Sequence, residues 1–244
     1  LVVGGSSEAD VSSLFLWVYG WVGVAMVSAL VGPVWTWLDP FTTLHDIGAA
    51  MLRRLGVQAW TPTPYRARLG AWPAVLGLVF FVWLELVYRG GGLGVVLIGY
   101  TVLTLVAMAN FGRDVWREQG ETFSVWFGTL NRLASFGAPS GAGGETVARR
   151  PFASGLLGPG WSGAHVVLVA VGAASILYDG LSQTQLWFDL FGLPSLPIAT
   201  VELLGFLGLV VGLALAVGRL VGLAAVGAGL VPIAVGYLIA HYLT

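Results

Sequence analysis

The chain ends in two long apolar runs, residues 198–218 and 220–243, which are separated by little more than Arg219. A helix that crosses the roughly 30 Å hydrocarbon core of a bilayer needs about 20 mostly apolar residues. Backbone in lipid must satisfy its own hydrogen bonds, which restricts spanning segments to helices or closed barrels. The two runs therefore predict a tight helical hairpin in a membrane, or one long kinked helical element.

Four further stretches reach or approach the same length. They lie at residues 13–38, 71–88, 93–111 and 163–178, of which the last is the shortest. The composition supports a membrane location, because only 9% of the 244 residues are charged and 57% are apolar, whereas about 25% of a soluble domain is charged. We therefore expect an all-α, polytopic transmembrane helical bundle of about six spans, forming a single domain over residues 1–244.

The composition also argues against several functional classes. The net charge is −1, which offers no basic footprint for nucleic acid, and the absence of Cys removes thiolate ligands and cysteine nucleophiles. The sequence contains no phosphate-binding loop, dinucleotide fingerprint, paired-histidine zinc helix or serine nucleophile elbow. The expected partners are membrane lipids, with other membrane subunits or a second copy of the chain as alternatives, and no motif implies a cofactor.

The basic residues predict an orientation. All eleven are Arg, and ten of them fall in the connections 39–70 and 112–162 or in the turn between the last two spans. Only Arg89 falls on the opposite side of a six-span arrangement. Because basic residues accumulate on the cytoplasmic face, we expect these connections to be cytoplasmic and Leu1 and Thr244 to be outside, in the inner membrane of a bacterium.

The two long connections contain helical patterns of their own. Residues 42–55 begin with Thr, carry Asp46 in the first turns and end close after two Arg, an arrangement that suits the helix dipole. Residues 113–136 place apolar and aromatic side chains at roughly helical spacing among charged ones. This second pattern predicts a cytoplasmic interfacial helix in the headgroup region or, as an alternative, a helix that packs against the bundle.

Glycine is abundant in the last two spans, where Gly208 and Gly212 stand four residues apart. Small residues at this spacing let two membrane helices approach closely. We therefore expect Gly208 and Gly212 to face another helix, with the alternative that small residues are simply common in such helices.

Five ionisable residues lie at or near membrane depth. They are Glu85, Arg89, Asp179, Glu202 and His241, and the expected topology places all of them toward the outer ends of their helices. Ionisable groups at this depth are costly and usually face the bundle interior or a polar cavity. Their shared level predicts a common polar site near the outer leaflet, open to an ion, a proton or a small polar ligand.

Each of these residues also has a structural interpretation. Glu85 and Arg89 stand at i and i+4 and can simply pair, and Asp179 can be a helix-end residue. Glu202 can stabilise a helix N-terminus by its charge, and His241 can form an interfacial pair with its neighbour in sequence. His241 is also a possible metal ligand together with carboxylates, although one such His is too few for a haem with two His ligands.

Several runs resemble a family of actinobacterial polytopic membrane proteins labelled fenitrothion hydrolases. They are YRARLGAWPA (65–74), FVWLELVYR (81–89), WREQGETFSVWF (116–127), YDGLSQT (178–184) and VPIAVGYLIAHY (231–242). The resemblance covers most of the chain in sequence order, and it implies hydrolysis of an organophosphate and a longer protein, which agrees with a first residue other than Met. The positions that match the family's polar motifs are Glu85, Arg89, Glu118, Glu121, Asp179 and His241.

Two hypotheses about function remain open at this point. The first is a transporter-like protein, or an integral subunit of a membrane complex, with its polar site near the outer leaflet. The alternative is a membrane-embedded enzyme, either the hydrolase that the resemblance implies or a metal or redox protein. The sequence shows no binuclear metal-ligand set of the kind that phosphotriester hydrolysis normally uses, so the first hypothesis is preferred.

Overall fold

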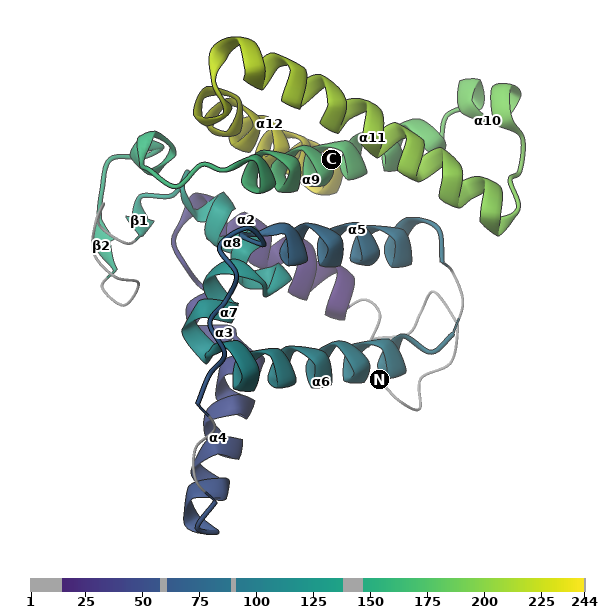
Figure 1. Ribbon diagram of the computed structural model, residues 1–244. Coiled ribbons are helices and arrows are strands. Elements are labelled where there is room, and N and C mark those ends of the chain that lie inside the picture. Colours follow the sequence, from purple (N-terminus) through teal and green to yellow (C-terminus); the bar gives the residue numbers. More distant parts are fainter. Residues whose placement is uncertain (1–14, 58–60, 89–90, 138–146, 244) are drawn as a thin grey trace.

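The computed structural model describes residues 15–57, 61–88, 91–137 and 147–243 (Figure 1). This part of the chain is helical apart from loops and one short β-pairing, which confirms the all-α class. The helices are η1 (Phe15–Gly23, a π-helix), α2 (Val24–Leu30), α3 (Trp35–Leu38), α4 (Pro40–Arg54), α5 (Trp72–Leu86), α6 (Leu93–Phe111), α7 (Arg113–Gln119), α8 (Thr122–Asn131), η2 (Ser154–Leu157), α9 (Gly163–Ser182), α10 (Gln185–Phe191), α11 (Leu196–Val221) and α12 (Leu223–Leu243). The strands β1 (Phe136–Gly137) and β2 (Ala148–Arg149) pair antiparallel.

Within the described residues, four helices are long and apolar enough to cross a membrane, namely α6, α9, α11 and α12. They correspond to the last four expected spans, and α9 extends to Ser182, beyond the expected end at residue 178. The first two expected spans coincide with shorter apolar helices at Trp17–Leu30 and Trp72–Leu86. The chain is thus a helical bundle with four helices of spanning length.

Helix α9 lies at the centre of this bundle, with α5 on one side and α11 and α12 on the other (Figure 1). Twelve of its 20 residues are buried. Most of them are Ala, Val or Gly, and such small side chains let neighbouring helices approach from several directions. The composition of α9 therefore explains why several helices can pack around it.

Two short helices fold back onto the bundle after α6. Gly112, whose φ is +93°, ends α6 in a conformation that favours glycine, and α7 then packs against α6 while α8 packs against α2 and α5. Seven of the ten residues of α8 are buried, among them Trp126 and Phe127. Helix α8 therefore packs against the bundle, as the alternative interpretation of residues 113–136 expected, and the headgroup location stays a prediction.

The expected packing through Gly208 and Gly212 is wrong within this chain. Both residues are exposed, and no heavy atom of a neighbouring element lies within 4 Å of the position that a β-carbon would take. Their faces of α11 point away from α9, because a different stripe of α11 is turned inward. That buried stripe consists of Leu203, Leu207, Ala214 and Gly218.

Close approach at glycine occurs at other positions. A β-carbon at Gly77 in α5 would lie 2.0 Å from Thr122 Oγ1, and one at Gly227 in α12 would lie 2.3 Å from Trp161 Cε3. Real β-carbons do not approach neighbours so closely, so each glycine is required by the group that rests on it. Gly77 thereby lets the start of α8 reach α5, and Gly227 seats the indole that precedes α9.

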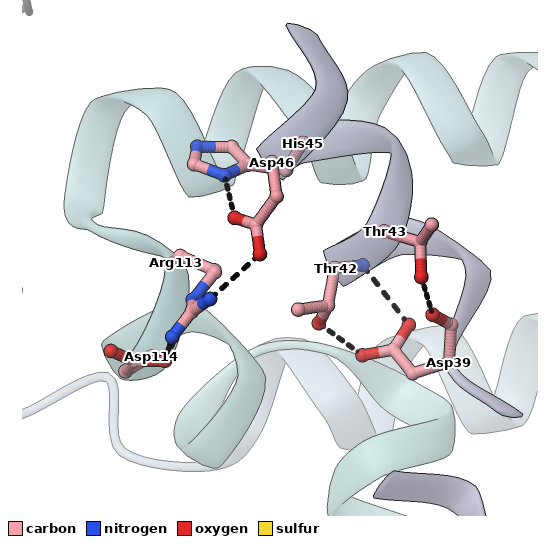
Figure 2. Close-up of polar contacts among 7 residues, drawn as sticks. All are labelled: Asp39, Thr42, Thr43, His45, Asp46, Arg113 and Asp114. Atoms are coloured by element: carbon pink, nitrogen blue, oxygen red, sulfur yellow. Dashed lines mark hydrogen bonds and ion pairs between the residues drawn. The ribbon is translucent and has the colours of Figure 1, made fainter. Parts of the chain in front are cut away.

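Helix α4 projects away from the other helices and runs across the direction of α5 and α6 (Figure 1). Asp39 caps it by accepting hydrogen bonds from the backbone N–H groups of Phe41 (2.9 Å) and Thr42 (3.2 Å). Asp46 then forms an ion pair with Arg113 of α7, with 2.9 Å between Oδ2 and Nη1 (Figure 2). The helix expected over residues 42–55 is confirmed, and this ion pair fastens it to the end of α6.

Helix α12 contains a proline, Pro232, in its interior. Proline has no N–H, so the helical hydrogen bond to the Ala228 carbonyl is missing. The helix nevertheless continues to Leu243 and makes its most extensive contact with α9. Packing along α9 therefore maintains the helix across this interruption.

Candidate functional site

Asp179 and His241 meet near the C-terminal ends of α9 and α12. The His241 Nε2 atom lies 2.8 Å from Asp179 Oδ2, and the Gln183 side-chain amide donates to Asp179 Oδ1 at 2.8 Å. The Asp179 and His241 side chains are 23% and 29% exposed, so the pair lies at the surface of the bundle and is partly open to its surroundings. Both carboxylate oxygens of Asp179 are thus engaged, and one of them is held by a group that can carry a positive charge.

Glu85 joins this pair from the end of α5. Its carboxyl group lies close enough to Asp179 and to Tyr242, the residue after His241, for electrostatic interaction, and all three side chains line one cavity. Three helices that are distant in sequence therefore bring two carboxyl groups, one imidazole and one phenol together. We refer to Glu85, Asp179, His241 and Tyr242 as the acidic cluster.

A small cavity adjoins the acidic cluster. It has a volume of about 20 Å³ and is lined by Glu85, Asp179 and Tyr242 on its polar side. The indoles of Trp21 and Trp126 line its apolar side. A cavity needs roughly 10–15 Å³ to hold one water molecule, so this space accommodates about one water or a bare ion and no larger ligand.

Glu202 stands apart from this arrangement. Glu202 lies on α11 near enough to Tyr178 for an electrostatic interaction, but it does not line the cavity, and its Oε2 atom is buried with no hydrogen-bonding partner among the described residues. Arg89 falls outside the described residues, so its expected pairing with Glu85 is untested. Of the five predicted residues, the structure brings Glu85, Asp179 and His241 together.

The geometry does not support His241 as a metal ligand. In the part of the chain that the structure describes, no three His, Asp or Glu side chains are grouped in a way that could hold a metal ion. His241 instead directs its Nε2 atom at Asp179. The interpretation of His241 as a member of an interfacial pair is closer to the observation, since its ring also makes an edge contact with Tyr242 at 4.8 Å between centroids.

A second buried carboxyl group, Glu121, belongs to a different part of the bundle. It is fully buried at the start of α8, where it accepts hydrogen bonds from the backbone N–H groups of Phe123 (3.0 Å) and Ser124 (2.6 Å). The Tyr100 hydroxyl donates to the same carboxylate. The sequence placed Glu121 only in a family motif, although an acidic residue close to the start of an apolar run is typical of a helix N-terminus. Its contacts satisfy a helix end and indicate a structural role.

Comparison with protein-family models, with curated proteins and with solved structures finds no match to this chain. The resemblance to the fenitrothion hydrolase family therefore stays a prediction from the sequence. Function has to be inferred from the acidic cluster and its surroundings.

Proposed function

We propose that this chain is a transporter-like integral membrane protein, acting alone or as a subunit of a membrane complex, whose acidic cluster binds a proton or a small cation. The observation that carries the proposal is the contact between Asp179 and His241 with Glu85 beside it. These groups come from three helices and adjoin a cavity with room for about one water molecule. A cavity of that size suits a proton or a small ion.

Electrostatics gives the reason for a cation. A carboxylate at membrane depth must be paired, hydrated or protonated, because burying an isolated charge is costly. Glu85 and Asp179 also repel each other when both are ionised. A proton shared within the cluster, or a cation in the adjoining cavity, relieves both costs, and His241 offers a further proton acceptor.

The expected membrane topology adds an orientation to this proposal. Four helices have spanning length, and we infer that the two shorter apolar segments, η1 with α2 and α5, also cross the membrane, which makes six crossings. In that arrangement the acidic cluster opens toward the outside and the Arg-rich connections are cytoplasmic. A cation would then enter the cluster from the outer face.

Reconstituted protein tests the proposal. Vesicles with an internal pH-sensitive dye, or with a sodium- or potassium-sensitive dye, report cation flux after a gradient is applied. We expect flux in wild type and loss of at least tenfold in Glu85→Gln and Asp179→Asn. The matched control is Asp189→Asn, which removes an exposed carboxylate from α10. Equal flux in all four proteins would rule out the acidic cluster as the site.

A membrane-embedded hydrolase is the second candidate. The observation in its favour is again the pair of Asp179 and His241, since a carboxylate that holds an imidazole is how many enzymes orient a general base. The corresponding test is release of the nitrophenol from fenitrothion by the purified protein, with His241→Gln as the inactive variant. Product formation that survives His241→Gln, or no product from wild type, eliminates this candidate.

A further inference from the structure

A second, larger cavity lies at the opposite end of the bundle from the acidic cluster. Its volume is about 240 Å³, and it is open to one side. Its walls come from α2, α3, α7, α8 and the start of α9. The polar residues that line it are Ser28, Thr36, Arg117, Glu118, Ser124, Thr129, Arg132 and His165.

Two guanidinium groups give this cavity its charge. Arg117 has no hydrogen-bonding or ion-pair partner within the described residues. Arg132 donates to the Pro159 carbonyl at 3.1 Å and lies 4.4 Å over the Trp161 ring, but it too contacts no carboxylate in the described part of the chain. Burial and the nearby charge of Arg150 lower the pKa of Arg132. Both effects indicate that Arg132 lacks a compensating anion.

Uncharged side chains that can donate hydrogen bonds also line this cavity. Ser28 is 0% exposed, and its Oγ atom has no hydrogen-bonding partner among the described residues. The Nδ1 atom of His165 lies 2.8 Å from Ser162 Oγ, which leaves Nε2 available to a ligand. Ser162 is also the N-cap of α9, a 20-residue helix whose positive dipole end faces this region. A buried hydroxyl without a partner is costly, so its presence beside two guanidinium groups that contact no carboxylate in the described residues suggests that a ligand completes the site.

We propose that this cavity binds a phosphate group, carried either by free phosphate or by the headgroup of an anionic phospholipid. Guanidinium groups recognise phosphate oxygens by charge-assisted, often paired hydrogen bonds, and a hydroxyl and an imidazole N–H add donors. Glu118 is the opposing charge, and it is exposed. Its side chain therefore reduces the net charge of the cavity without filling the donor positions.

Free phosphate is tested with full-length protein in a neutral detergent. Sodium phosphate is titrated against sodium chloride of equal ionic strength, and tryptophan fluorescence is followed because Trp35 lines the cavity and Trp161 touches Arg132. We expect a saturable change that is specific to phosphate. Arg117→Gln should weaken binding at least tenfold, and we expect it to leave the fold intact because Arg117 has no partner among the described residues. Glu118→Gln should tighten binding, whereas Arg219→Gln, the same charge change at the end of α11, should leave it unaltered.

The lipid source is tested in phosphatidylcholine nanodiscs that contain a minor fraction of phosphatidic acid. Native mass spectrometry then counts the phosphatidic acid molecules retained by wild type, Arg117→Gln and Ser28→Ala. Retention by wild type that both variants lose, without a response to free phosphate, assigns the site to a headgroup. A response to free phosphate assigns it to a soluble ligand. No phosphate-specific binding in either arm, or binding that Arg117→Gln does not change, overturns the proposal.

Discussion

The Trp126 indole rests on the backbone of Gly172, where a β-carbon would lie 2.1 Å from Trp126 Cη2. Both residues are buried and line the cavity beside the acidic cluster. We expect Gly172→Val to destabilise the protein by about 1–3 kcal/mol or more, the usual scale of overpacking. Thermal unfolding in detergent measures the change.

Gly212→Val is the matched control for that substitution. Gly212 has no neighbouring atom within 4 Å of its β-carbon position, so the same change should alter stability by less than about 0.5 kcal/mol. Strong destabilisation by Gly212→Val would mean that the exposed face of α11 is covered by a second protein chain. Tolerance of Gly172→Val would contradict the packing of α8 on α9.

Glu121→Ala removes the carboxylate that caps α8. Two backbone N–H groups and the Tyr100 hydroxyl lose their acceptor, and buried donors without partners cost about 1–3 kcal/mol each. We expect a clearly lower unfolding temperature in detergent. Glu118→Ala, three residues earlier on the exposed side of α7, should change it little, and equal effects of the two substitutions would argue against the capping role.

Cysteine accessibility tests the orientation, since the chain contains no Cys of its own. A single Cys at Ser195, which precedes α11, should react with an impermeant maleimide in intact cells. A single Cys at Ser154 in η2 should react only after the membrane is permeabilised. The reverse pattern would place the Arg-rich connections outside.

The lowered pKa of Asp46 predicts a small dependence of the unfolding free energy on pH in the acidic range. Burial raises the pKa of Asp46, but the hydrogen bond with His45 and the charge of Arg113 outweigh it and hold this pKa below the ordinary value of 3.8. Because the folded-state pKa is lower than the unfolded one, the stabilisation is present above pH 3.8 and is lost as the pH falls through the folded-state pKa. Half of the Asp46 side chain is exposed, so its contribution is at most about 1 kcal/mol.

The variant that checks this is Asp46→Asn. Wild type should exceed the variant in unfolding free energy at pH 6, and the difference should shrink below about pH 4. The same difference should be smaller in an Arg113→Gln background, because the ion partner is gone while the contact with His45 remains. If the difference in unfolding free energy grew on acidification, the predicted direction of the Asp46 pKa shift would be wrong.

Helix positions could be predicted from the sequence because apolar run length alone limits a spanning segment. The contact between Asp179 and His241 could also be predicted from the sequence, since both residues stand near the C-terminal ends of helices that run in the same direction. Glu202 stands at a similar level on α11, yet it does not reach the cavity. Its direction around the helix axis depends on how α11 packs against α9, and run length carries no information about that rotation.

The same limit explains the glycine result. Spacing alone favoured Gly208 and Gly212, whereas the close contacts occur at Gly77, Gly172 and Gly227, where a large or polar group of another element happens to lie. Each of these contacts needs a partner that is distant in sequence. The spacing of residues along a single helix identifies the small residues, but it does not show which residues of other helices pack against them.

Helix α12 contacts residues that lie beside both cavities. Gly227 seats Trp161, the ring beneath Arg132, and His241 holds Asp179 about 20 Å farther along the same helix. Pro232 lies between these two contacts and deprives the Ala228 carbonyl of its helical hydrogen bond, which makes bending less costly there than elsewhere along the helix. A tilt of either half about Pro232 would therefore act as a lever, in which a displacement of Trp161 at one face of the bundle changes the distance between Asp179 and His241 at the other.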